Sequence, residues 1–234
     1  MISMRNAFFG CMVVMAVLVG AAGNRWADVD ESVVHRAQTT EKIAAITIDD
    51  GPHEVATPRM LDALRAENVK ATFFVLGKSA EQYPELVKKV LAEGHEVATH
   101  GYSHRNMARL SRQECEAEWE KTEQILAPLG AKVTLFRPPG GSYGQVLTDG
   151  AKARGYHMIL WDVDPRDWQA PPADVVAERI TQAVRPGSII LLHDGQYPIH
   201  SADALRKVVR QLKEEGYSFV TVGELLGRSA GGQE

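Results

Sequence analysis

Short apolar, β-branched runs alternate with amphipathic windows along the chain from Ile43 onward. The short runs predict strands, because they are bounded by turn-forming residues and are too brief for helices. We expect seven strands, at residues 43–48, 71–76, 96–99, 133–136, 157–161, 188–192 and 218–222. The windows between them carry apolar residues three and four positions apart, which predicts helices. We expect these at residues 57–67, 80–93, 111–129, 145–154, 173–184 and 201–215, with a capping-box pattern at Ser111 and Glu114.

This alternation predicts a mainly parallel sheet covered by helices. Seven strands fit either a barrel, closed or incomplete, or an open doubly wound sheet. The chain has 234 residues, of which 44% are hydrophobic, and this suits one core and a single domain. The formal net charge is -4 with acidic and basic residues interleaved, so nucleic acid is not an expected partner. We find neither a G-x-G-x-x-G nor a P-loop sequence, which argues against nucleotide binding.

The first 23 residues differ from the rest of the chain. A start with one positive charge, Arg5, precedes a run from residue 7 to 22 without formal charge, and small residues follow at Ala21, Ala22 and Gly23. This order predicts a secretory signal peptide, with an uncleaved membrane anchor as the alternative. We therefore expect an exported protein of the periplasm, the cell envelope or the medium. Residues 24–41 are interpreted as a linker, 42–227 as the domain, and 228–234 as a polar tail.

Reactive side chains cluster directly after the predicted strands. In parallel α/β folds the carboxyl ends of the strands meet at one face, where active sites are built. Side chains that follow five different strands are therefore expected to converge there; they are Asp49, Asp50, His100, His104, Arg137, Asp167 and His193.

The pair His100 and His104 is a candidate for metal binding, because histidines four residues apart can face one ion. Surface or core histidines remain the alternative. Asp49 and Asp50 are adjacent carboxylates at a strand end, and their side chains point in different directions. One of the two carboxylates can complete a site of two histidines and one carboxylate, while the other serves as general base on water. A turn at Asp50-Gly51-Pro52 is the simpler explanation, but it leaves the second acid unexplained.

Three further side chains fit roles around that pair. Arg137 is expected near Asp49, to orient it and keep it ionised, although it could instead bridge two loops. The loop Pro138-Pro139-Gly140-Gly141 would be rigid, and the backbone N–H groups of its glycines could face a developing oxyanion. His193 is the candidate general acid, with Asp167 holding it protonated, unless it is a core histidine.

These motifs, read in order from Lys42 to Leu226, resemble the polysaccharide deacetylases with a NodB homology domain, carbohydrate esterase family four. The resemblance implies a distorted, incomplete (β/α)7 barrel in which Asp49 is the base, His193 the acid, and Arg137 and Asp167 their partners. It implies one divalent transition metal on Asp50, His100 and His104, zinc first, with cobalt, nickel or manganese as alternatives. It further implies that Leu191 and Trp168 line a pocket for the acetyl methyl group. The implied partner is an acetylated polysaccharide or oligosaccharide.

The chain departs from the family pattern at three positions. Gly101 stands where the family usually has a hydroxyl residue that braces the metal loop, Gly140 where an aromatic is common, and Ile48 where Phe is common. The substrate stays open among chitin oligomers, peptidoglycan, an exopolysaccharide and acetylated xylan, with N- or O-acetyl hydrolysis. A degenerate carbohydrate-binding barrel and a small-amide hydrolase of the same fold are the alternatives. Cys115 lies in a charged helical window and is expected to have no catalytic role.

Overall fold

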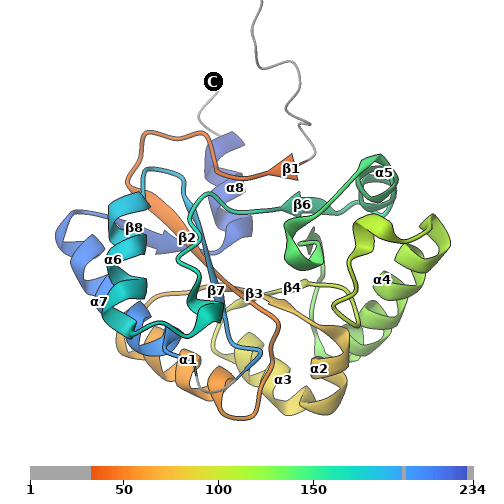
Figure 1. The fold of residues 1–234 in the computed structure, drawn as a ribbon, viewed down its shortest axis with the longest axis horizontal. Helices are drawn as coiled ribbons and strands as arrows, with labels where there is room; N and C mark the ends of the chain where they lie inside the picture. The colour runs from red at the N-terminus through yellow and green to blue at the C-terminus, as the bar shows by residue number, and fades with distance from the viewer. Residues whose placement is uncertain (1–32, 197–198, 231–234) are drawn as a thin grey trace, which may run out of the picture. The chain divides into compact units, whose positions relative to one another are not determined.

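One curled parallel sheet organises the protein, and helices cover its outside (Figure 1). The computed structural model describes residues 33–196 and 199–230, so the predicted signal peptide lies outside the described residues. The strands of this part of the chain are β1 Val33–Val34, β2 Ile43–Asp49, β3 Thr72–Val75, β4 Glu96–Thr99, β5 Leu135–Phe136, β6 His157–Ile159, β7 Ile189–His193 and β8 Ser218–Val220. The helices of more than one turn are α1 Ala56–Ala66, α2 Gly77–Gln82, α3 Pro84–Ala92, α4 Arg112–Leu126, α5 Gln145–Ala153, α6 Ala173–Ala183, α7 Ser201–Glu214 and α8 Val222–Ala230.

The strands follow the order β1-β6-β5-β4-β3-β2-β7, and β8 adds to the start of β2. Every strand pair is parallel. The sheet therefore confirms the predicted α/β class and curls into an incomplete barrel. In the register of β2 with β7, Asp49 lies directly beside His193. The two residues expected to act as base and acid thus come from neighbouring strand ends.

Strand β2 is buried along its whole length, and its side chains alternate between two environments. Ala44, Ile46 and Ile48 pack outward into the largest core cluster, against apolar residues of α1, α3, α6 and α7. Ile43 and Ala45 point into the barrel, where they meet Leu225 of α8 and other inward residues. The same alternation places Thr47 and Asp49 on the inner face, above this apolar floor. None of the described helices is long and apolar enough to cross a membrane.

The segment predicted as a linker belongs in part to the sheet, so that interpretation is wrong from Val33 onward. Val33 and Val34 pair with β6, and the backbone N–H of Ala37 donates to Gly187 O at 2.9 Å, just before β7. Arg36 bridges to Ser188 in the same place. A two-residue strand gives no periodic signal, which is why the sequence pattern missed it. This segment therefore bridges β6 and the amino end of β7.

Other element boundaries also differ from the prediction. The helix expected at residues 80–93 is two helices, because Pro84 begins α3 and ends the preceding hydrogen-bond pattern. The last strand stops at Val220, and Val222 begins α8, so the last residue of the expected strand and the first three residues of the expected polar tail are helical. The capping box of Ser111 and Glu114 is present as predicted.

Candidate active site

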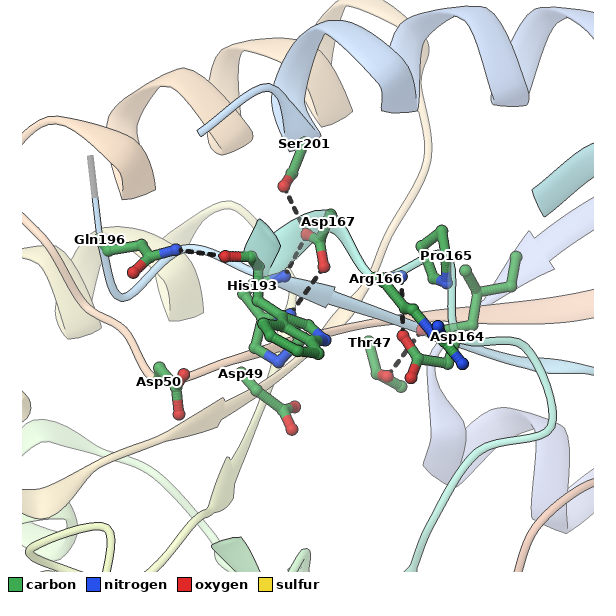
Figure 2. Close-up of polar contacts among 12 residues, drawn as sticks. Thr47, Asp49, Asp50, Asp164, Pro165, Arg166, Asp167, His193, Gln196 and Ser201 are labelled. Carbon is green, nitrogen blue, oxygen red and sulfur yellow. Dashed lines mark hydrogen bonds and ion pairs between the residues drawn. The ribbon is translucent and has the colours of Figure 1, made fainter. Parts of the chain in front are cut away.

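The predicted residues converge at the carboxyl ends of the strands, around a cavity of about 460 Å³. Figure 2 shows Asp49, Asp50 and His193 facing the same space from neighbouring elements, with Asp167 behind the imidazole. The residues lining the cavity are Asp49, Asp50, His100, His104, Gly140, Trp161, Asp164, Trp168, Leu191, His193, Gly195 and Gln196.

Asp50, His100 and His104 offer one ligand atom each, and these atoms all lie within 4.8 Å of one another. His100 Nδ1 is 2.8 Å from Arg137 O, which fixes the ring with Nε2 turned toward the carboxylates. His100 Nε2 and His104 Nε2 are 3.5 and 3.3 Å from Asp50 Oδ1. That oxygen is buried, and no described donor makes a directed hydrogen bond to it. Two imidazoles and an orphaned carboxylate oxygen fit a divalent transition metal.

Electrostatics favour the metal-binding protonation state of Asp50 and His100 and oppose it in His104. Burial lowers the pKa of His100, which favours the neutral imidazole that a metal binds. Burial opposes ionisation of Asp50, but His104 and His100 outweigh it and lower the pKa of Asp50 to about 2. His104 is about half exposed, and its contact with Asp50 raises its pKa. Because a metal binds the neutral ring, metal binding competes with protonation of His104.

Arg137 is fully buried inside the barrel and holds Asp49. Its Nη1 donates to Asp49 Oδ1 and to Thr47 Oγ1, both at 2.7 Å. Its Nε and Nη2 donate to the backbone oxygens of Ile159 and Leu160 at 3.1 and 2.9 Å. The guanidinium thus donates hydrogen bonds to four acceptors and fixes one oxygen of Asp49. The other oxygen, Asp49 Oδ2, lies 3.8 Å from His100 Nε2.

His193 is oriented by Asp167 from behind. His193 Nδ1 is 2.7 Å from Asp167 Oδ1, and the His193 backbone N–H donates to Oδ2 at 2.8 Å. Ser201 Oγ donates to the same Oδ2 at 2.5 Å. Burial favours the neutral ring, but the hydrogen bond and charge of Asp167 outweigh it and raise the pKa of His193 to about 9. The imidazole is therefore protonated at neutral pH.

The expected substrate contacts divide into two groups. Gly140, Trp168 and Leu191 line the cavity, and Trp168 is 49% exposed at its rim. Pro138 and Pro139 are buried and do not line it. A Cβ on Gly140 would meet no atom within 4 Å. The cavity is therefore open at the position where the family commonly has an aromatic side chain.

Several residues that shape the site were not predicted. Trp161, Asp164 and Gln196 line the cavity, and each follows a strand that the sequence pattern did locate. Thr47 was available to prediction too, because it lies two residues before Asp49 and so shares its face. Ser201 lies far along the chain from Asp167, and no sequence signal points to their contact.

Asp194 supports the loop that carries Asp50. It is 1% exposed, and its Oδ2 accepts from Thr57 Oγ1 at 2.5 Å. Burial raises the pKa of Asp194 to about 7. A Cβ on Gly51 would lie 2.2 Å from Asp194 Oδ1, so only glycine fits beside this carboxyl group.

A parallel barrel that gathers Asp49, His193 and a three-residue cluster able to hold a metal at its carboxyl-terminal face has the arrangement of an α/β-barrel hydrolase. The comparisons identify the family: the model described as polysaccharide deacetylase matches residues 36–159, just over half of the chain. The chain belongs to the polysaccharide deacetylase family, of the NodB and carbohydrate esterase four type. This confirms the resemblance, the fold class and the assignment as a hydrolase.

Relatives with established names are similar over most of the chain. A peptidoglycan-N-acetylglucosamine deacetylase of Bacillus cereus is 39% identical over 197 residues, covering 83% of this chain and 92% of the relative. A chitooligosaccharide deacetylase of Sinorhizobium fredii is 37% identical over 198 residues, covering 79% of this chain and 92% of the relative. A crystal structure of a peptidoglycan N-acetylglucosamine deacetylase matches with a TM-score of 0.81 and 36% identity, covering 84% of this chain and 93% of that one.

Proposed function

We propose that this chain hydrolyses N-acetyl groups on N-acetylglucosamine units of a cell-envelope or extracellular glycan, releasing acetate. Peptidoglycan is the first candidate and chito-oligosaccharides are the second. The observation that carries the proposal is the arrangement of two buried pairs, Asp49 with Arg137 and His193 with Asp167, on neighbouring strand ends beside the metal cluster. Relatives named for N-acetylglucosamine polymers support the choice of substrate.

The proposed cofactor is one divalent transition metal held by Asp50, His100 and His104, zinc first and cobalt, nickel or manganese as alternatives. When bound, such an ion supplies positive charge that acidifies water and polarises an acetyl carbonyl group. The orphaned Asp50 Oδ1 and the fixed ring of His100 support this assignment.

Asp49 is the proposed general base. Arg137 and its hydrogen bonds hold one carboxylate oxygen, so the side chain cannot rotate away from the cavity. The other oxygen takes a proton from the attacking water as the water oxygen bonds to the carbonyl carbon. The backbone N–H of Gly140, at the cavity wall, is the proposed donor to the developing oxyanion.

His193 is the proposed general acid. Its Nδ1 faces Asp167, so the proton that it can deliver sits on Nε2, toward the cavity. As the carbon–nitrogen bond breaks, this proton passes to the leaving sugar nitrogen, and acetate and a free amine result. Leu191 and Trp168 are the proposed apolar contacts for the acetyl methyl group. An O-acetyl group would follow the same steps with an oxygen leaving group.

The N-terminal 23 residues support export, because their order of charge, apolar run and small residues is that of a signal peptide. Peptidoglycan and extracellular glycans lie outside the cytoplasmic membrane, which agrees with that interpretation. A membrane contact would come only through an uncleaved N-terminus.

The test is acetate release from a panel of acetylated glycans, with purified protein stripped by chelator and resupplied with zinc or cobalt. We expect metal-restored release from peptidoglycan or chito-oligosaccharides, and a loss of about 10²–10⁴-fold in Asp49→Asn and His193→Gln. His157→Gln, an exposed histidine on β6, is the matched control and should keep normal turnover. No release from any glycan by metal-loaded protein would contradict the proposal, and normal rates in the two variants would contradict the roles.

A further inference from the structure

The loop that carries both histidines, residues 100–104, has an unusual backbone and is called the metal loop below. Gly101 and His104 have φ angles of +77° and +61°, in the left-handed region that favours glycine. The position after His100 has no side chain, so the hydroxyl brace expected from the family pattern is missing. Something else must hold this backbone if both imidazoles are to face Asp50.

Glu118 of α4 makes that connection. Its Oε2 accepts the backbone N–H groups of Tyr102 and Ser103 at 2.8 and 2.9 Å. Its Oε1 accepts from Ser103 Oγ at 2.6 Å. Glu118 is 8% exposed, so water competes little for these hydrogen bonds. One side chain thus fixes two consecutive amides between the two metal ligands.

The space beside Gly101 explains why the brace has this form. A Cβ there would lie 3.5 Å from Glu118 Oε2 and 3.1 Å from Met107 Sδ. The carboxylate of Glu118 therefore lies beside the position of the missing side chain. The loop is also tied by Gly77 N–H to Gly101 O at 2.9 Å and by Lys78 N–H to Tyr102 O at 3.0 Å. These bonds hold the carbonyl groups of Gly101 and Tyr102. Thr99 Oγ1 accepts the Gly101 N–H at 3.1 Å, and Glu118 holds the amides of Tyr102 and Ser103.

We propose that Glu118 is a positioning residue that sets the geometry of the metal loop and thereby the affinity of Asp50, His100 and His104 for a divalent metal. The inference rests on the proposed metal-dependent function. Partners that orient metal ligands typically contribute about 10–100-fold to metal affinity. Glu118 acts through the backbone between the two histidines, at a distance from the reacting atoms.

The experiment measures the zinc dissociation constant by competition with a chromophoric chelator, which needs no substrate. Glu118→Leu removes all three acceptor contacts, and we expect its dissociation constant to rise by about 10–100-fold. Glu118→Gln keeps an oxygen for the amides and a donor for Ser103 Oγ, so it should stay close to wild type. Glu120→Leu, two residues along α4 and exposed, is the matched control.

Folding of each variant is checked by circular dichroism. If Glu118→Leu does not fold, the zinc dissociation constant of Glu118→Asp is the test. Aspartate keeps the charge but is one methylene shorter, so it should also weaken zinc binding. Unchanged zinc affinity in a folded Glu118→Leu, or in Glu118→Asp if only that variant folds, would overturn the inference. Equal losses in Glu118→Leu and Glu118→Gln would assign the effect to charge and overturn it too. Absence of zinc binding in the wild type would instead refute the proposed metal site.

Discussion

Replacing Asp167 by Asn tests whether this residue sets the acidity of His193. The pKa of His193 is raised to about 9 from an ordinary value of 6.5, with Asp167 as its nearest charge. This increase in pKa corresponds to roughly 3 kcal/mol favouring the protonated ring. Asparagine can still accept a hydrogen bond, but it carries no charge, and the burial that favours the neutral ring remains. We therefore expect the pKa of His193 to fall to 6.5 or lower in Asp167→Asn.

The consequence for catalysis follows from the protonated fraction. At pH 7.5 a pKa of about 9 leaves roughly 97% of the imidazole protonated, whereas a pKa of 6.5 leaves about 9%. Loss of the acid form alone should then lower kcat/KM about tenfold at this pH, and the alkaline limb of the pH profile should move by more than two units. At pH 5.5 the two proteins should differ much less.

The same shift has a consequence for stability with a definite sign. Because the folded-state pKa of His193 is raised, its contribution to stability is fully present below pH 6.5 and is lost as the pH rises through about 9. Asp167→Asn should lack this dependence, so the stability difference between the two proteins should shrink above pH 9.

The direct assay is an NMR titration of the His193 ring. It uses metal-free protein, so that the charge of a bound cation does not add to the effect of Asp167 on the pKa of His193. Asp174→Asn, an exposed aspartate paired with Lys207, is the control and should leave the titration unchanged. If the His193 pKa stayed near 9 in Asp167→Asn, Asp167 would not be the cause of the shift, and the proposed acid–base pairing would have to be abandoned.

Three other changes test the scaffold. Arg137→Lys offers three donors to four buried acceptors, so at least one acceptor is left unpaired. The free energy of unfolding measured in urea should therefore drop by about 1–3 kcal/mol or more. An unchanged urea midpoint would contradict the claim that all four hydrogen bonds of Arg137 stabilise the fold. Gly51→Ala places a Cβ 2.2 Å from Asp194 Oδ1, so Tm should fall by several degrees, and an unchanged Tm would show that the loop relaxes freely. Val33→Asp puts a charge at a site that is 5% exposed, and limited proteolysis should then cut before Lys42 while the rest of the domain persists; equal resistance of both proteins would count against the bridging role of β1.

Much of the site was predictable because its chemistry follows directly after long, buried strands. Asp49 and Asp50 end β2, and His193 ends β7, so locating the strands also located the side chains. The two pairings of Asp49 with Arg137 and His193 with Asp167 were expected, and the structure brings each pair together at 2.7 Å.

The parts that were missed depend on contacts between distant segments. Glu118 reads as one more polar residue of a charged helix, and only the fold brings it to Ser103. Strand β1 is two residues long, which is too short for an alternation of apolar and polar residues to be recognised in the sequence. The break before Pro84, by contrast, did have a signal, because proline favours the first turn of a helix and disrupts the preceding one.

The segment that bridges β6 and β7 also sets the order in which the barrel can be completed. Val33 pairs with Met158, and Ala37 bonds to Gly187, so the earliest described part of the chain waits for partners that are synthesised more than a hundred residues later. Asp49 on β2 likewise lies beside His193 on β7. Contacts of such long sequence separation form slowly, since the intervening chain must be ordered first. The polypeptide therefore cannot close its barrel until most of it has left the ribosome.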